Sequence, residues 1–179
     1  MERVSTRLQG PVLLAPDVHA DARGFFLETF RADRYRQGGI GVTFVQDNHS
    51  RSVRGTLRGL HAQRRRPQGK LVRVVRGEIF DVAVDIRPQS STFGRWVGER
   101  LSEESFRQMF IPAGFAHGFC VLSEVAEVEY KCSDYYDRAD EIGARWDSAG
   151  IVWPIARPLL SAKDAALPTL AELRRTLEG

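Results

Sequence analysis

The sequence predicts a mainly β protein, an antiparallel jelly-roll barrel with a few short helices at its edges. Three observations support this: apolar and polar residues alternate with period two through the middle of the chain, the apolar runs are short, and glycine or proline separates them at near-even spacing. Many short, evenly spaced strands are typical of such architectures. In GEIFDVAVDIR the alternation places Phe80, Val82, Val84 and Ile86 on one face, opposite Ile79, Asp81, Ala83, Asp85 and Arg87.

Further short strands are expected in KLVRVV, FGRWVGERLS, QMFIPAG, HGFCVLS and AEVEYKCSDYY, and two helices flank them. The segment RADRYRQGG predicts one short helix that ends at its two glycines. The tail LPTLAELRRTL predicts a second, because Thr169 and Glu172 fit a capping box. We expect this helix to pack on the outside of the barrel through the apolar stripe Leu170, Leu173 and Leu177.

The length of 179 residues fits one domain, 1–179, and no repeat or linker divides it. Hydrophobic content of 42% and charged content of 27% are those of a globular protein. No apolar run approaches the roughly 20 residues of a membrane span, and the N-terminus lacks a signal pattern. We therefore expect a cytoplasmic protein without a membrane partner.

The charge pattern favours an anionic small ligand over a nucleic acid. The net charge is +3, and the only dense basic run, RRRPQGK, contains proline and glycine, which predicts a solvated loop over Arg64–Arg66. No aromatic residue interleaves with it, so a stacking platform for single strands is not supported. Cys120 and Cys132 form no disulfide framework or zinc knuckle, and we expect buried reduced thiols.

Two histidines lie beside glycines near expected strand starts, His61 in RGLHAQ and His117 in IPAGFAHGF, and a barrel can bring both to one mouth. A metal site is disfavoured, because no second histidine or carboxylate follows His61 at short range. The neighbouring cations Arg58 and Lys70 suit an anion or a developing oxyanion instead.

An acid–base site needs a base, an opposing acid and a cation near the developing charge. His61 can serve as the base, Tyr130 as a proton donor from the other side, and Lys70 as the cation. Asp164 can orient the imidazole. From spacing alone, Tyr130 is better explained as a core or rim tyrosine, and Asp164 serves equally well as a capping or turn residue.

Polar residues in DARGFFLETF and FVQDNHS are of types that bind a sugar, a base edge or a diphosphate: Arg23, Glu28, Gln46 and Asn48. Hydrogen bonding within loops explains them equally well. The sequence has no glycine-rich phosphate loop, no dinucleotide fingerprint and no Gly-x-Ser-x-Gly elbow.

Eight segments carry a family resemblance: DARGFFLETF, QDNHSRS, GTLRGLH, QGKLVRVVRGEIFDVAVDIRPQSSTFG, IPAGFAHGF, EYKCSDYY, EIGARW and LLSAKD. Each alone is weakly specific, but all eight in this order resemble the dTDP-4-dehydrorhamnose 3,5-epimerase family. The resemblance runs from about Gly10 to Pro168. It implies a cupin-type β jelly roll that works as a homodimer without metal or cofactor on a dTDP-4-keto-6-deoxyhexose.

The resemblance also implies roles for individual residues. His61 matches the family base, Asp164 its carboxylate partner, Tyr130 the acid on the opposite face and Lys70 the cation beside the enolate oxygen. Asp81 is expected to lie behind these residues. The residues expected to bind substrate are Arg23, Glu28, Gln46, Asp47, Asn48, Arg58, His117, Tyr136, Glu141 and Lys163, with Arg23 and Glu28 in a segment that can reach across the dimer.

The sequence departs from the family pattern at Ala62, where an aromatic residue is more common, and we expect this to widen the pocket or alter sugar orientation. The segment WDSAGIVWP is shorter than usual, which affects mainly a surface turn. Four functions stay open: epimerisation at C3, C5 or both, a 4-keto to 3-keto sugar isomerase, a nucleotide-sugar binding module, and a metal-dependent cupin enzyme.

Overall fold

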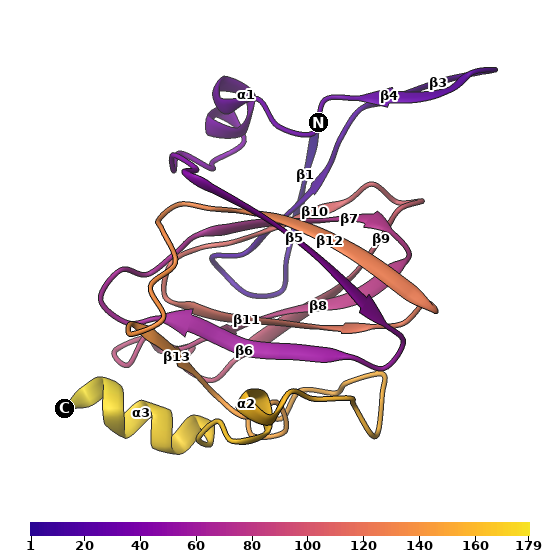
Figure 1. The fold of residues 1–179 in the computed structure, drawn as a ribbon. Helices are drawn as coiled ribbons and strands as arrows, with labels where there is room; N and C mark the ends of the chain where they lie inside the picture. Colours follow the sequence, from indigo (N-terminus) through magenta and orange to yellow (C-terminus); the bar gives the residue numbers. More distant parts are fainter.

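The computed structural model describes residues 1–179, apart from the side chain of Ser5, and consists of two antiparallel sheets that face each other (Figure 1). The six-stranded sheet has the order β1 (Glu2–Ser5), β2 (Val12–Ala15), β10 (Gln108–Ile111), β7 (Lys70–Arg76), β12 (Val125–Cys132) and β5 (Gln46–Val53). The five-stranded sheet has the order β13 (Glu141–Gly143), β6 (Leu57–Gln63), β11 (Phe115–Val121), β8 (Glu78–Asp85) and β9 (Trp96–Ser102). This arrangement confirms the predicted antiparallel jelly roll.

The main core lies between the sheets and follows the alternation along β8. Ile79 and Ala83 point into the core between the sheets, whereas Val82 and Val84 belong to a second apolar cluster on the other face. β11 is buried along its whole length. A strand covered on both faces reads as a continuous apolar run, which is why its sequence shows little alternation.

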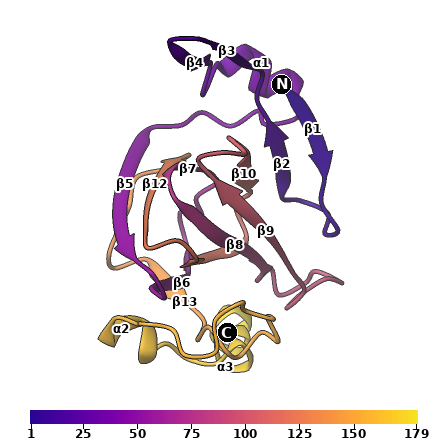
Figure 2. The same ribbon diagram turned by 90° about the vertical axis from the view of Figure 1, so that its right-hand side faces the viewer.

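The outer face of the five-stranded sheet is covered by the C-terminal segment, which contains α2 (Ala162–Ala165) and α3 (Leu170–Glu178) (Figure 2). Thr169 and Glu172 form the predicted capping box, and Leu170 and Leu173 are buried. α2 begins after Ser161, whose hydroxyl accepts a hydrogen bond from the backbone N–H of Asp164. The C-terminal segment thereby both closes a core and fixes the position of Asp164.

The N-terminal region lies on the other side of the molecule. α1 (Ala32–Gln37) buries Tyr35 against the outer face of the six-stranded sheet. The hairpin of β3 (Val18–Asp21) and β4 (Gly24–Leu27) projects away from both sheets (Figure 1). Phe25 and Phe26 on this hairpin are 60% and 71% exposed. Phe25 packs against Phe106 within the chain, with ring centroids 4.7 Å apart, and both hairpin rings keep much of their surface exposed.

The remaining expectations concern the basic run and the cysteines. Arg64–Arg66 are exposed in the connection between β6 and β7, as predicted, and Arg65 and Arg66 pair with Asp140 and Asp134. Cys120 and Cys132 are both buried and unpaired. In the described part of the chain, no helix is long and apolar enough to cross a bilayer.

Candidate active site

An interior pocket of about 480 Å³ opens between the two sheets, and all four residues of the predicted acid–base set line it. This volume lies within the range of small-ligand sites. Predicted binding residues Arg58, His117 and Lys163 line it as well. The full lining is Ser50, Thr56, Leu57, Arg58, His61, Lys70, His117, Phe119, Tyr130, Leu159, Leu160, Ser161, Lys163 and Asp164.

His61 and Asp164 form a hydrogen-bonded pair, with 2.6 Å between His61 Nε2 and Asp164 Oδ1. Burial opposes ionisation of Asp164, but its contacts with His61 and Ser161 outweigh this effect, so the pKa of Asp164 is lowered. An ionised carboxylate on one ring nitrogen fixes the imidazole orientation and stabilises a proton on the ring. The pair therefore has the geometry of an oriented base.

The position of His61 depends on a close approach of β6 to β11. Gly59 has φ of +119°, and a Cβ there would lie 2.6 Å from Gly118 Cα and 2.7 Å from the carbonyl oxygen of His117. Only glycine fits such a conformation at that distance. The approach makes His61 and His117 direct partners in the ladder between the two strands.

His117 forms a second histidine–carboxylate pair at the back of the pocket. Its Nε2 lies 2.6 Å from Oδ1 of Asp81, and both side chains are buried. Asp81 therefore lies behind the pocket-lining residues, as expected from the sequence. Its second oxygen, Oδ2, is one of two buried side-chain polar atoms without a hydrogen-bond partner among the described residues, and the other is Ser50 Oγ.

Lys70 and Tyr130 reach the pocket from the opposite sheet, on β7 and β12. Lys70 Nζ lies 6.0 Å from the centre of the Tyr130 ring, and no residue in the described chain forms a hydrogen bond or ion pair with that nitrogen. Burial lowers the pKa of Lys70, although the charges of Glu141 and Asp81 oppose this. Burial raises the pKa of Tyr130, so its phenol keeps its proton.

The rim of the pocket is a hydrogen-bonded group around Glu141. Tyr136 donates to Glu141 Oε2 at 2.7 Å, and Lys163 contacts the same oxygen. The other oxygen, Oε1, lies 4.0 Å from His61 Nδ1. Burial opposes ionisation of Glu141, but these neighbours hold its pKa below the usual value. The three predicted binding residues of this rim thus contact one another and border the base.

Gln46 and Asn48 belong to a hydrogen-bond chain beside the pocket rather than to its lining. Gln46 donates to Asn48 Oδ1 and accepts from the backbone N–H of Tyr136, and Asn48 contacts Cys132 Sγ at 3.5 Å. Cys132 is the direct partner of Lys70 in the sheet. The chain therefore links the rim tyrosine to the strand position of the lysine.

Arg58 crosses the pocket between the sheets. Its Nε donates to Ser52 Oγ at 3.0 Å, which joins β6 to β5. Because Ser52 is its only close side-chain partner in the described chain, its charge is not neutralised by a carboxylate. A guanidinium in this state suits a phosphate oxygen.

Three predicted binding residues lie away from this pocket. Arg23 projects from the β3–β4 hairpin and pairs with Asp21, and Glu28 pairs with Arg34. Asp47 lies on the opposite face of β5 from Gln46 and Asn48, where it contacts Lys131 at 2.9 Å. The alternation of side chains along a strand explains this correction, since neighbours in sequence point to opposite faces.

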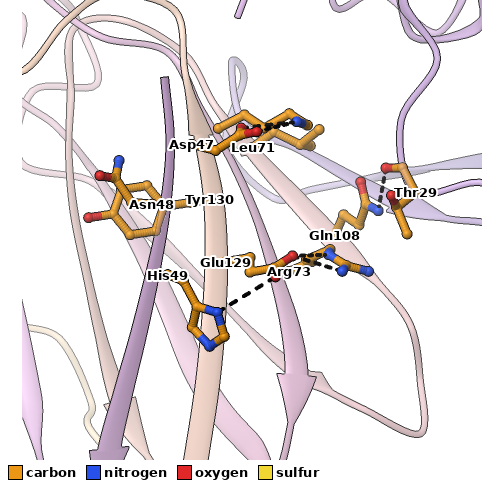
Figure 3. Close-up of a pocket in the computed structure, with 10 residues that line it drawn as sticks. Thr29, Asp47, Asn48, His49, Leu71, Arg73, Gln108, Glu129 and Tyr130 are labelled. Atoms are coloured by element: carbon orange, nitrogen blue, oxygen red, sulfur yellow. Dashed lines mark hydrogen bonds and ion pairs between the residues drawn. The ribbon is translucent and has the colours of Figure 1, made fainter. Parts of the chain in front are cut away.

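Asp47 instead lines an outer pocket of about 220 Å³ on the far side of the six-stranded sheet, and Asn48 and Tyr130 also border this pocket (Figure 3). Its charged residues are paired with one another: Arg73 contacts Glu129 at 2.7 Å, and His49 lies 3.7 Å from the same carboxylate. Gln108 donates to the backbone oxygen of Thr29. This pocket was not predicted from the sequence.

Some of the interior lining was missed as well, notably Ser50 and the segment Leu159–Ser161. A sequence signal for Ser50 was present, because it follows Gln46 and Asn48 at a spacing of two. The expectation for Ala62 is wrong: its side chain packs with Leu60 and Ile142 in the outer apolar cluster, not in the pocket. The small size of the Ala62 side chain therefore affects how the sheet packs beneath the C-terminal segment, and not the shape of the pocket.

Chemically, the interior pocket holds an oriented imidazole on one sheet and a protonated phenol on the other, with an unpaired lysine near the phenol. This arrangement can remove a proton from carbon on one face of a ligand and supply one on the opposite face, while a cation stabilises an oxyanion. Among the described residues, no three His, Cys, Asp or Glu side chains are gathered as metal ligands.

Comparison with known proteins agrees with this chemistry. The family model for dTDP-4-dehydrorhamnose 3,5-epimerase matches residues 5–172. The dTDP-4-dehydrorhamnose 3,5-epimerase of Pseudomonas aeruginosa is 55% identical over 166 residues, covering 89% of this chain and 92% of that protein. The dTDP-4-dehydrorhamnose 3-epimerase of Streptomyces niveus is 40% identical over 171 residues, covering 93% and 83%.

Solved structures give the same result. The dTDP-6-deoxy-D-glucose-3,5-epimerase of Legionella pneumophila, in complex with dTDP-4-keto-L-rhamnose, superposes with a TM-score of 0.92 at 49% identity over 96% of both chains. ChmJ, a 3'-monoepimerase from Streptomyces bikiniensis in complex with dTDP-quinovose, has a TM-score of 0.89 at 36% identity, covering 98% of this chain and 90% of that one. This chain is therefore an enzyme of the dTDP-4-dehydrorhamnose 3,5-epimerase family.

Proposed function

We propose that this enzyme inverts C3, C5 or both in a dTDP-4-keto-6-deoxyhexose, as a step in the biosynthesis of a deoxysugar. One observation carries the proposal: the His61–Asp164 pair and Tyr130 reach one pocket from opposite sheets, with an unpaired Lys70 beside them. Pure binding of a nucleotide sugar does not require an acid and a base on opposed walls. The pocket geometry therefore favours an epimerase over a binding module.

In the proposed reaction, the ketone at C4 makes the hydrogens on C3 and C5 acidic. His61 takes one of them, the C–H electrons form an enolate, and the positive charge of Lys70 stabilises its oxygen. The Tyr130 phenol then donates a proton to the same carbon from the opposite face, which inverts the centre. His61 returns its proton to solvent and Tyr130 recovers one, so the protein is unchanged overall.

The nucleotide is proposed to bind toward the rim. Arg58 and Lys163 provide cations for the diphosphate, and the exposed ring of Tyr136 offers a face on which thymine can stack. His117, held by Asp81, is proposed to contact the sugar from the back of the pocket. Together with Lys70 and Tyr130, these groups come from both sheets and from the C-terminal segment, which supports a function of residues 1–179 as a single domain.

We propose a homodimer in which the β3–β4 hairpin of each chain reaches the pocket of its partner. Within one chain, Arg23 and Glu28 do not line the interior pocket, while Phe25 and Phe26 on the same hairpin are exposed. Burying these aromatic rings against a partner would also bring Arg23 toward a second diphosphate-binding position. Light scattering at micromolar concentration should give the mass of a dimer, and a monomer would contradict this part of the proposal.

The proposal includes inversion of one centre as well as of two, because the relatives include both 3,5-epimerases and monoepimerases. A cytoplasmic location is also proposed, since both cysteines are unpaired thiols. A 4-keto to 3-keto isomerase is less favoured, because it would have no use for a proton donor on the wall opposite the base.

The test is proton NMR of dTDP-4-keto-6-deoxyglucose with the enzyme in deuterium oxide. We expect loss of the C3 or C5 proton signal, and inverted product after chemical reduction. Exchange at both centres identifies a 3,5-epimerase, and exchange at one identifies a monoepimerase. Binding of the substrate without exchange at either centre would contradict the proposed function and favour a binding module.

A further inference from the structure

The base His61 lies between two carboxylates, only one of which is needed to orient it. Asp164 contacts Nε2 at 2.6 Å, and Glu141 lies 4.0 Å from Nδ1. Both carboxylates are largely buried, with side chains 6% and 11% exposed. Charges this close and this well shielded from water interact strongly with any proton on the imidazole. Glu141 therefore acts electrostatically on His61 in addition to its hydrogen bonds at the rim.

Lys163 partly cancels the charge of Glu141 in the free enzyme. The two side chains form an ion pair, and Lys163 is the residue next to Asp164 on α2. The group of His61, Asp164, Glu141 and Lys163 therefore carries a charge of −1 when the imidazole is neutral and zero when it is protonated. Uptake of the substrate proton by His61 would make the group electrically neutral.

The ion pair between Lys163 and Glu141 is open to an anion that enters the pocket, because its lysine is exposed there. Lys163 is 55% exposed, lines the interior pocket and has no other carboxylate partner in the described chain. An exposed lysine ammonium readily exchanges one anion for another of higher charge. A diphosphate entering the pocket is such an anion, and it would leave Glu141 without its cation beside His61.

We propose that Glu141 is a positioning residue that strengthens the base His61, and that Lys163 controls this effect by binding either Glu141 or the substrate diphosphate. The free enzyme then holds a weaker base, and the bound nucleotide converts it to a stronger one. The inference rests on the proposed function, because it assumes that the ligand carries a diphosphate. Its consequence is that the base gains strength only when a substrate is present.

The other charged or titratable groups around His61 act differently. Lys70, Arg58 and His117 line the same pocket, and Tyr130 lies on the facing sheet. None of these contacts Glu141 by a hydrogen bond or ion pair in the described chain. Tyr136 contacts Glu141, because its hydroxyl donates a hydrogen bond to the carboxylate at 2.7 Å. A thymine ring that stacks on Tyr136 would therefore also disturb the rim. Among these residues only Lys163 pairs its charge with Glu141, so removing the Lys163 charge should raise the proton affinity of His61, whereas removing the Glu141 charge should lower it.

The experiment is an NMR titration of the His61 Cε1–H signal, assigned with His61→Asn, in the wild type, Glu141→Gln and Lys163→Met. We expect the midpoint of Glu141→Gln to be lower than that of the wild type by roughly 0.5–1 pH unit, and that of Lys163→Met to be higher by a similar amount. Saturating dTDP should raise the wild-type midpoint more than that of either variant. Glu127→Gln, which alters the carboxylate 3.2 Å from His49, is the matched control and should leave His61 unchanged.

A rim that is merely structural predicts another result, because both substitutions break the same ion pair and would shift His61 in the same direction or not at all. Either outcome would overturn the proposal, as would equal responses to dTDP in all three proteins. The titration needs no turnover, so an inactive wild type would refute the proposed function and leave the electrostatic result readable. In an active enzyme, the acid limb of kcat/KM should follow the same order of midpoints.

Discussion

The two pockets lie on opposite faces of the same strands, β5, β7 and β12, and they differ in how their charges are satisfied. In the outer pocket Arg73 and His49 both contact Glu129 (Figure 3), and Asp47 contacts Lys131. In the interior pocket the Lys70 ammonium and the Tyr130 phenol have no partner within the described chain, and Ser50 Oγ is buried without one.

A ligand is expected in the interior pocket rather than in the outer one. A folded chain normally pairs its buried polar groups, and those left unpaired cost free energy unless something else binds them. The outer pocket is complete by itself, so a ligand would have to break existing ion pairs. The interior pocket offers groups that a ligand can pair without breaking an existing ion pair of the chain.

The largest expected difference between the pockets is seen when the histidine of each is substituted by asparagine. His61→Asn removes the base and should lower kcat by roughly 10²–10⁴-fold. His49→Asn removes the histidine of the outer pocket and should change kcat by less than about twofold, because its partners Glu127 and Glu129 are not part of the proposed reaction. Steady-state kinetics with dTDP-4-keto-6-deoxyglucose measures both, and similar losses would remove the distinction between the pockets.

Tyr130 borders both pockets, and its substitution separates proton removal from inversion. Tyr130→Phe should lower the rate of inversion by roughly 10²-fold or more, while His61 still exchanges the substrate proton for deuterium on its own face. Proton NMR in deuterium oxide distinguishes exchange from inversion. Tyr35→Phe is the control: that hydroxyl bonds Gln108 behind the outer pocket, and its loss should lower Tm without changing kcat.

The lysines of the two pockets differ in their expected effect on the pH profile of the reaction. Lys70 acts only while protonated, and because burial lowers its pKa, kcat/KM should fall on the alkaline side at a pH below the ordinary lysine value of 10.5. Tyr130 cannot cause this limb, since its own pKa is raised. Lys70→Met should lower kcat by roughly 10²-fold and abolish the limb.

Lys131→Met, in the outer pocket, should keep the wild-type pH profile, because that lysine pairs with Asp47 on the surface. An alkaline limb that persists unchanged in Lys70→Met would show that another group is responsible.

The smallest effect is expected from the ion pair between Arg73 and Glu129. Both side chains are about one-third exposed, and such pairs contribute about 0–1 kcal/mol to stability. A double-mutant cycle with Arg73→Ala and Glu129→Ala, measured by urea unfolding, should give a coupling free energy in this range with kcat unchanged. A coupling well above this range would mean that the outer pocket is more strongly organised than its exposure indicates.

The fold could be predicted because period-two alternation and turn residues report directly on strands, as β8 and the capped helix α3 confirm. The site was predicted in part. Spacing alone could not join His61 to Asp164, which are 103 residues apart, because tertiary packing of the C-terminal segment brings them together. The family resemblance supplied that pairing.

Other features depend on the face to which a side chain points. Ala62 was expected in the pocket and lies in the outer cluster, and Asp47 was expected with Gln46 and Asn48 and lies on the opposite side of β5. Both follow from alternation once the register of the strands is known. Arg23 and Glu28 lie outside the interior pocket and pair with Asp21 and Arg34 within the chain, because they belong to the projecting β3–β4 hairpin and to the residue that follows it.

The most direct test of the distinction between the two pockets is a crystal structure of the enzyme with dTDP-glucose, a stable substrate analogue. We predict that the sugar occupies the interior pocket between His61 and Tyr130, with the diphosphate near Arg58 and Lys163. The outer pocket should keep its ion pairs unchanged. Density for the sugar in the outer pocket, or an interior sugar with both His61 and Tyr130 on the same face, would contradict the account.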